Sequence, residues 1–183
     1  MGLIIVLVVL AVIVFGLIAI YNGLVSLRVR ADNSWSDIDV QLKRRHDLIP
    51  NLVETVKGYA SHEKGTFENV ARYRSAAMAA TTPEERSAAE GQLTQALRGL
   101  LAVAEAYPQL QANQNFMSLQ ATLQQIEDAI QNARRYYNAV VRDYNTKVQS
   151  FPSNVVAGMF HFEPRQFFNL DTPADREVPA VKF

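Results

Sequence analysis

The feature that most constrains this chain is an uninterrupted apolar run from Leu3 to Ile20. Its 18 residues carry no charged or polar side chain, and as a helix rising about 1.5 Å per residue they would span roughly 27 Å. That length matches the hydrocarbon core of a bilayer, so we expect a transmembrane helix here. Tyr21 follows directly, where an amphipathic ring favours the membrane–water interface.

A cleaved signal peptide and a buried core helix are the alternatives to a retained anchor. Signal peptides begin with basic residues and end at a small-x-small cleavage site. This chain begins Met1-Gly2 and offers only Ala19-Ile20-Tyr21 as a cleavage site, so we expect the anchor to be retained. Arg28 and Arg30 follow the run and nothing basic precedes it. The positive-inside rule then places the rest of the chain in the cytoplasm.

Composition excludes several classes of function. Residues 1–27 carry no charged side chain, and the remainder holds 18 basic and 18 acidic residues, so the net charge is zero. Nucleic-acid binders usually show a basic excess, so we expect no nucleic-acid partner. The chain has no cysteine, which excludes disulfides, thiolate nucleophiles and thiolate metal sites.

Apolar residues recur every three or four positions in two later segments, which is typical of long helices. The segment from Asn113 to Ser150 predicts one helix with a continuous apolar seam, made of Phe116, Leu119, Leu123, Ile126, Ile130, Ala133, Tyr137, Val140, Tyr144 and Val148. The segment from about Asn33 to Ala80 predicts another, with Trp35, Ile38 and Leu42 on its seam. Arg45 occupies one slot of that seam, and a charge there needs a partner or an escape to water.

Proline and capping residues predict where these helices bend, begin and end. Pro50 should kink the helix that contains it, and Ala31–Ser34 could break it, because Asp, Asn and Ser are good N-caps. Thr82 and Glu85 flank Pro83 in a capping-box pattern, so a further helix should begin there and run to about Ala106. A short amphipathic helix is expected over Asn154–Phe162.

The sequence therefore predicts an all-α protein: one transmembrane helix, a soluble bundle of three long antiparallel helices, a short C-terminal helix and an extended tail. The expected boundaries are residues 1–22 for the anchor, 23–162 for the bundle and 163–183 for the tail, in which Phe167, Phe168 and Phe183 should dock on the bundle or on a neighbouring subunit. The first bundle helix would be about twice as long as the second. An unpaired seam must be covered, either by the tail or by other copies of the chain, and the mismatch is our main reason to expect self-association.

No pattern indicates catalysis, a cofactor, a metal or a small-molecule substrate. His62-Glu63 resembles the start of a zinc-protease motif, but Thr66 stands where the second histidine would be. The basic residues near the anchor could contact lipid phosphates; they are Arg28, Arg30, Lys43, Arg44 and Arg45. The alternative for such a run is a solvated or salt-bridged helix face.

Several long motifs resemble the LemA family. They are Tyr21-Asn22-x-Leu24-Val25, the run from Trp35 to Val53, Ala104-Glu105-Ala106-Tyr107-Pro108, Asn113-x-Asn115-Phe116, Tyr137-Asn138, Tyr144-Asn145 and Phe151-Pro152-x-Asn154. The resemblance implies a bacterial inner-membrane protein with one N-terminal span, its short terminus outside, and a helical bundle. It carries over no catalytic residue, and it links some relatives to the building of intracellular membrane compartments.

Two functions remain open at this point. The first is a membrane-anchored scaffold that self-assembles through its helix seams and organises or shapes the inner membrane, with lipids and further copies of the chain as partners. The second is a membrane-tethered adaptor or regulator of another membrane protein, such as a protease or a signalling component.

Overall fold

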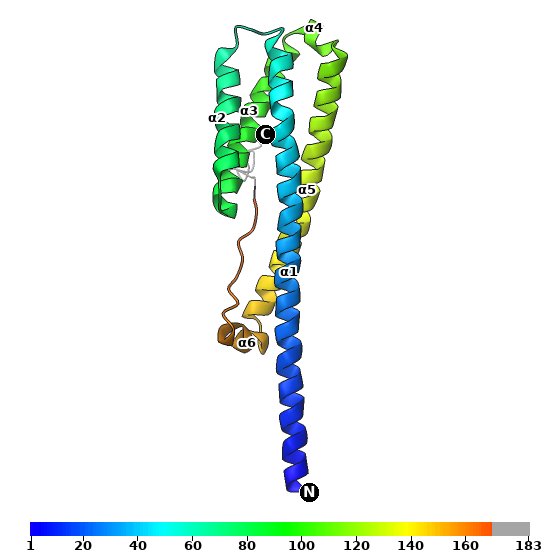
Figure 1. Ribbon diagram of the computed structural model, residues 1–183, viewed down its shortest axis with the longest axis vertical. Helices are drawn as coiled ribbons and strands as arrows, with labels where there is room; N and C mark the ends of the chain where they lie inside the picture. The colour runs from blue at the N-terminus through cyan, green and yellow to red at the C-terminus, as the bar shows by residue number, and fades with distance from the viewer. Residues whose placement is uncertain (170–183) are drawn as a thin grey trace, which may run out of the picture. The chain divides into compact units, whose positions relative to one another are not determined.

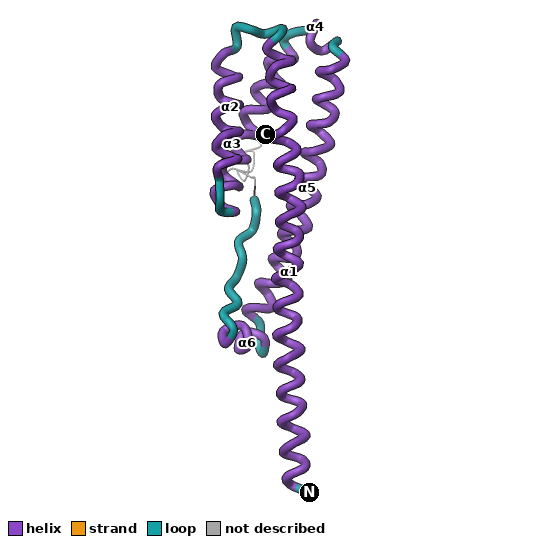
Figure 2. The backbone as a smooth tube through the Cα atoms, in the orientation of Figure 1, coloured by secondary structure: helices purple, strands orange, loops and turns teal. Residues whose placement is uncertain are grey.

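The computed structural model describes residues 1–169, and helices make up all the regular secondary structure in that range (Figures 1 and 2). The all-α prediction is therefore confirmed. The helices are α1 (Gly2–Lys57), α2 (Lys64–Ala79), α3 (Pro83–Glu105), α4 (Pro108–Gln111), α5 (Gln114–Gln149) and α6 (Ser153–Met159). They form two compact units. Unit 1 holds Met1–Asp37 and Arg135–Phe167, and unit 2 holds Ile38–Arg134 with Phe168 and Asn169.

The N-terminal helix α1 is continuous over its whole length. The break considered at Ala31–Ser34 does not occur, because the Ser34 hydroxyl donates a 3.0 Å hydrogen bond to the Ala31 carbonyl within the helix instead of capping a new one. The helix also continues through Pro50.

The single helix expected from Asn33 to Ala80 is wrong, because α1 ends at Lys57 and the chain turns before α2 begins. Gly58 weakens the helix at this point, and the amides of Tyr59 and Ala60 close the turn on the Val56 carbonyl at 3.0 and 2.9 Å. The turn brings Phe67 and the following apolar residues of α2 back onto the core. Folding back therefore buries apolar surface that a straight helix would leave uncovered.

The predicted start of α3 is confirmed in detail. The Thr82 hydroxyl accepts a 3.2 Å hydrogen bond from the Glu85 amide, and the Glu85 carboxylate accepts one of 3.2 Å from the Thr82 amide. The one-turn helix α4 was not predicted, although it buries Leu110. The side chain of Asn113 accepts a 3.0 Å hydrogen bond from the Phe116 amide at the start of α5.

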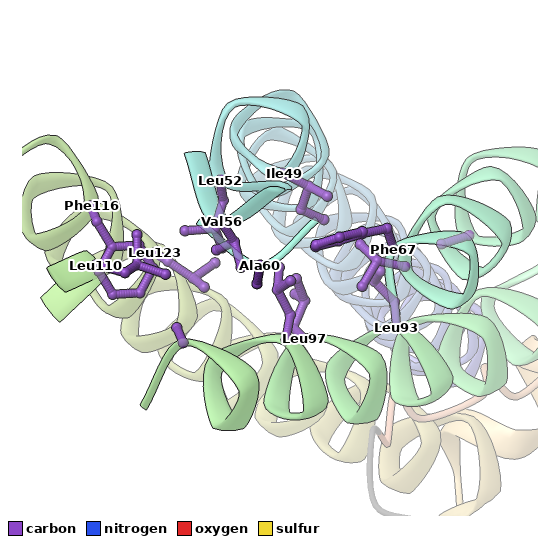
Figure 3. Close-up of a cluster of buried hydrophobic side chains, with 14 residues drawn as sticks. Ile49, Leu52, Val56, Ala60, Phe67, Leu93, Leu97, Leu110, Phe116 and Leu123 are labelled. Carbon is purple, nitrogen blue, oxygen red and sulfur yellow. The ribbon is translucent and has the colours of Figure 1, made fainter. Parts of the chain in front are cut away.

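Unit 2 is a four-helix arrangement in which α1, α2, α3 and α5 alternate in direction (Figure 1). Its core gathers side chains from each of these helices, together with Leu110 of α4 (Figure 3). The core residues are Ile49, Leu52, Val56, Ala60, Phe67, Val70, Ala77, Leu93, Leu97, Leu100, Ala104, Leu110, Phe116 and Leu123. Splitting the predicted first helix into α1 and α2 thus supplies the fourth helix.

Unit 1 pairs the N-terminal part of α1 with the C-terminal part of α5 and with α6. Its cluster is built from Leu24, Tyr144, Val148, Val156, Ala157 and Phe162. Residues 163–169 contain no helix or strand, Phe168 is fully buried, and Phe167 is 46% exposed. Phe183 and the remaining tail positions, 170–182, lie outside the described residues.

The seam residues are buried or half-buried within one chain. Ile38, Leu42, Phe116, Leu123, Ile126, Ile130, Tyr137 and Tyr144 are buried, whereas Trp35 and Leu119 are half-buried. The length mismatch that suggested uncovered seams disappears once α2 folds back. These seams therefore serve the packing of a single chain.

Candidate functional site

The apolar run at the start of α1 is exposed from Leu3 to Ala19, and Ile20 is half-buried. Leu3 is 75% exposed and Ile18 is 50% exposed, and no residue of the apolar window is buried. In the described part of the chain, α1 is the one helix long and apolar enough to cross a membrane. A surface of this size with no protein cover fits lipid as its surroundings.

Where the run ends, α6 lies against α1. The Tyr21 ring meets Phe160 at a centroid distance of 4.8 Å and Phe162 at 5.7 Å. The Arg28 guanidinium lies over the Phe162 ring, 5.1 Å from its centroid. The aromatic ring expected at the interface is thus part of a small aromatic cluster that joins α1 to the end of α6.

The candidate lipid-phosphate residues divide into two groups. Arg28 and Arg30 are exposed in unit 1, 8 and 10 residues beyond Ile20, or about 12–15 Å of helix. Lys43 and Arg44 are exposed in unit 2, and their contact with lipid stays a prediction. The predicted lipid contact of Arg45 is wrong, because its side chain is fully buried and paired within unit 2, where no lipid phosphate can reach it.

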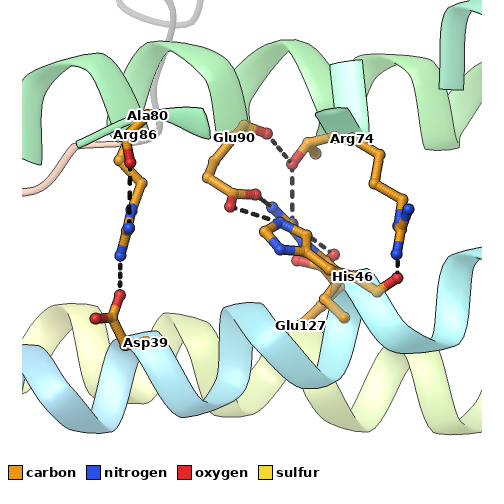
Figure 4. Close-up of polar contacts among 9 residues, drawn as sticks. Asp39, His46, Arg74, Ala80, Arg86, Glu90 and Glu127 are labelled. Atoms are coloured by element: carbon orange, nitrogen blue, oxygen red, sulfur yellow. Dashed lines mark hydrogen bonds and ion pairs between the residues drawn. The ribbon is translucent and has the colours of Figure 1, made fainter. Parts of the chain in front are cut away.

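Arg45 is the centre of a buried ionic network that joins α1, α3 and α5 of unit 2 (Figure 4). Its guanidinium pairs with the Glu90 carboxylate, and its Nη1 lies 2.8 Å from Glu127 and 3.2 Å from the Thr94 hydroxyl. The second Glu90 oxygen lies 2.8 Å from Nε2 of His46. The partner that a charged seam position needs is therefore supplied within the chain.

Electrostatics keep both members of the central pair ionised. Burial alone would raise the pKa of Glu90, but the hydrogen bond to His46 and the charge of Arg45 outweigh it and hold that pKa below its ordinary value. Burial alone would lower the pKa of Arg45, but Glu90 and Glu127 outweigh it and raise that pKa. The network is thus a charged, hydrogen-bonded tie across three helices.

A cavity of about 310 Å³ opens beside this network, lined by His46 and Glu90 together with Asp39, Lys43, Arg86 and others. Arg86 pairs with Asp39 across it, linking α3 to α1 (Figure 4). Within residues 1–169 no three histidine, aspartate or glutamate side chains are grouped so that they could hold a metal ion.

In unit 1 a second polar cluster fixes the chain that follows α6. The side-chain amide of Asn145 donates a 2.8 Å hydrogen bond to the main-chain carbonyl of Arg165. Its oxygen accepts another of 2.8 Å from the main-chain N–H of Arg165. The Tyr137 hydroxyl donates 3.0 Å to the Gln166 carbonyl, and the Arg165 guanidinium lies 2.6 Å from Asp32. The described start of the tail therefore packs on its own chain, and burial raises the pKa of Tyr137.

Sequence reasoning identified part of each cluster. It placed Arg45 on the seam but did not name its partners. Glu90 lies three residues before Leu93, on the same face of α3, so helical spacing could have found it. The Tyr-Asn pairs at Tyr137 and Tyr144 are seven residues apart, which is typical of helix packing, and nothing in that spacing indicates the backbone of Arg165 as the partner of Asn145.

Comparison with known proteins gives a consistent result. A sequence model of the LemA family matches residues 34–183. Magnetosome protein MamQ 2 of Paramagnetospirillum magneticum is 25% identical over 184 residues, covering 86% of this chain and 68% of that protein. Magnetosome protein MamQ of Magnetospirillum gryphiswaldense is 22% identical with the same coverage. Protein LemA of Metamycoplasma hominis is 26% identical over 137 residues, covering 74% of this chain and 63% of that protein.

Proposed function

Because the chain belongs to the LemA family, we propose that it is a membrane-anchored helical scaffold that self-associates and organises the bacterial inner membrane. The family membership and the exposed apolar helix support membrane association. We propose the scaffold role, the self-association and the location of the chain beyond the span on the cytoplasmic side of the membrane.

One observation carries the proposal. The exposed apolar run continues without a break into the part of α1 that packs against α5 and α6 in unit 1. A flexible tether would place a loop between span and folded unit. Here the same helix provides both, so the orientation of unit 1 follows that of the span, as a membrane-organising protein requires.

We include self-association because one copy alone has too small an effect on the bilayer. A single chain embeds one helix, and one helix occupies too little bilayer to shape it. Copies must therefore gather, and closed symmetric assemblies are the usual form. Relatives named as magnetosome proteins support a role at a membrane compartment. The proposal includes no catalytic role.

Oligomeric state tests the scaffold. Native mass spectrometry of the full-length protein, released from lipid nanodiscs, should give one defined multimer. A monomer at every concentration would contradict self-association. Crosslinking in cells separates the alternative: self-adducts support the scaffold, whereas one dominant partner protein would support a membrane-tethered adaptor or regulator of another membrane protein.

The cysteine-free sequence makes orientation easy to measure. Gly2→Cys and Ser61→Cys each introduce one thiol, on either side of the span and both at exposed positions. In intact spheroplasts a membrane-impermeant maleimide should label Gly2→Cys and spare Ser61→Cys. The reverse pattern would place unit 2 outside the cytoplasm and overturn that part of the proposal.

A further inference from the structure

The α6 face, made of large apolar side chains in α6 and at its two ends, is mostly exposed in the described chain, although one of its rings, Phe160, contacts Tyr21. Phe151 is 83% exposed, Val155 53%, Met159 65% and Phe160 54%. The opposite face is packed, with Val156 and Ala157 buried in the unit 1 cluster. Four large apolar side chains gathered on one short segment are unusual on a surface that faces water.

This face lies level with the end of the apolar run. A cavity of about 240 Å³ beside α6 is lined by Leu17 and Ile18 of the run, by Tyr21, and by Met159 and Phe160. Figure 1 shows α6 alongside this part of α1. If Leu3–Ile20 crosses the hydrocarbon core, Met159 and Phe160 lie where the acyl chains meet the headgroups.

Basic side chains lie on the side of α6 away from the run. Arg28 rests on the Phe162 ring, and Arg30 is exposed two residues further on. Lys147 of α5 reaches back to Gly23, where its ammonium occupies the space a side chain would fill. Apolar side chains toward the core with cations toward the headgroups form the usual arrangement of an interfacial membrane element.

We propose that the face of α6 formed by Phe151, Val155, Met159 and Phe160 inserts into the lipid leaflet next to the span, as a second membrane contact for unit 1. This rests on the membrane anchoring in the proposed function. Lipid is the occupant because the face is continuous with the span surface that lipid must already cover. A shallow wedge beside a span occupies one leaflet only, so it would give the scaffold a means to bend a bilayer.

The test uses full-length protein in vesicles of phosphatidylethanolamine with a minority of phosphatidylglycerol. A nitrobenzoxadiazole dye is attached to Val155→Cys or Met159→Cys, both exposed positions in a chain with no other thiol. Lipids spin-labelled at the headgroup or high on the acyl chain should quench most of the emission, because interfacial elements lie about 5–10 Å deep. Ser36→Cys is the matched control. It is exposed in unit 1, 16 residues or roughly 24 Å of helix beyond Ile20, and should stay unquenched.

A charge on the face provides the second variant. Met159→Asp should abolish quenching of the dye at position 155, whereas Asn154→Asp adds the same charge to exposed α6 without removing an apolar contact and should leave quenching intact. Circular dichroism verifies that both variants keep their helix content.

Emission at positions 155 and 159 that matches position 36 would overturn the insertion. So would dye–dye excitation transfer at position 159 without lipid quenching, since that result would assign the face to a second copy. Native mass spectrometry of the same samples keeps the two proposals apart. A multimer without quenching refutes only the insertion, and a monomer with quenching refutes only self-association.

Discussion

Nε of Arg74 in α2 donates a 2.8 Å hydrogen bond to the main-chain carbonyl of His46 in α1 (Figure 4). That carbonyl would ordinarily accept from the amide of the residue four positions later, but this residue is Pro50, which has no N–H. A side chain from the neighbouring helix thus satisfies a backbone group that the proline leaves free, which explains how α1 continues through Pro50.

A double-mutant cycle tests this compensation. Arg74→Leu should lower the free energy of unfolding by about 1–2 kcal/mol, since it leaves a main-chain acceptor unsatisfied. In a Pro50→Ala background the helix supplies its own donor, so the same change should cost less, with a coupling of about 1 kcal/mol. Urea unfolding followed by circular dichroism measures both.

Arg72→Leu is the control for this cycle. Arg72 is exposed, and its guanidinium contacts Asn69 and Tyr73 of its own helix. Its replacement should change stability by less than about 0.5 kcal/mol in either background. An equal cost of Arg74→Leu with and without Pro50 would show that the two residues act independently.

The buried network predicts unequal roles for its two glutamates. Glu90 is fully buried, so Glu90→Gln leaves the Arg45 charge poorly compensated and should cost about 3–5 kcal/mol. Glu127 is 27% exposed, so water can replace it and Glu127→Gln should cost about 1 kcal/mol or less. Replacing the pair together, by Arg45→Met with Glu90→Leu, should restore much of the loss. Similar losses from the two glutamine variants would contradict this account.

The lowered pKa of Glu90 predicts how stability depends on pH. A carboxyl whose pKa is lower folded than unfolded stabilises the fold fully above the unfolded value, here 4.5, and loses that stabilisation as the pH falls through the folded value. As far as Glu90 is concerned, the urea concentration at the midpoint of unfolding should therefore stay constant down to about pH 5 and decrease at lower pH. Glu90→Gln should flatten the fall.

Glu85 limits how flat that profile can become. Hydrogen bonds from the backbone amides of Thr81 and Thr82 also lower its pKa, so part of the acid sensitivity should persist in Glu90→Gln. A profile for Glu90→Gln as steep as that of the unchanged protein would show that folding does not lower the pKa of Glu90.

The seam of α5 carries a simpler prediction. Ile130 is fully buried and Leu123 is 5% exposed, so replacing both by aspartate should unfold unit 2, since each buried unpaired charge costs several kcal/mol. Ser118→Asp with Thr122→Asp, at exposed positions of the same helix, is the matched control. Native-like circular dichroism for the seam variant would refute the seam assignment.

How far the sequence could predict this fold depends on the range of the interaction involved. The capping box at Thr82 and the seam of α5 are local patterns, and both were predicted correctly. The end of α1 at Lys57 was missed, because its cause is the packing of Phe67 onto a core built from residues far along the chain. The periodic pattern runs on both sides of Gly58, so it could not show that turning back there buries Phe67 in the core.

The polar clusters follow the same rule. Burial of Arg45 could be expected from its place on the seam, but its pairing with Glu90 depends on how α1 and α3 align. The amphipathic pattern over Asn154–Phe162 predicts that Val155, Met159, Phe160 and Phe162 are exposed. The prediction is right for the first three and wrong for Phe162, which is 6% exposed and packs in the unit 1 cluster. That the α6 face lies beside Leu17 and Ile18 could not be predicted from the sequence, because it depends on the packing of Tyr21 against Phe160.

The last prediction concerns the hydrogen bonds between α5 and the segment that follows α6. Asn145 makes two hydrogen bonds to the backbone of Arg165, one as donor and one as acceptor. Asn145→Ala removes them together, while Tyr137 and Asp32 keep their interactions with Gln166 and Arg165. The loss of about 1–3 kcal/mol should speed amide hydrogen exchange over residues 163–168 by roughly tenfold or more.

Thr146→Ala, at the exposed neighbouring position, should leave this exchange unchanged, and Asn145→Asp should fall between the two because it keeps an acceptor for the Arg165 amide. Exchange over the α5 core near Val141, which is fully buried, should stay slow in all three variants, since the two hydrogen bonds of Asn145 reach only the tail. Unaltered exchange over residues 163–168 in Asn145→Ala would mean that the aromatic packing of Phe162 and the Arg165–Asp32 pair hold this segment without Asn145. The Tyr-Asn repeat would then serve helix packing alone.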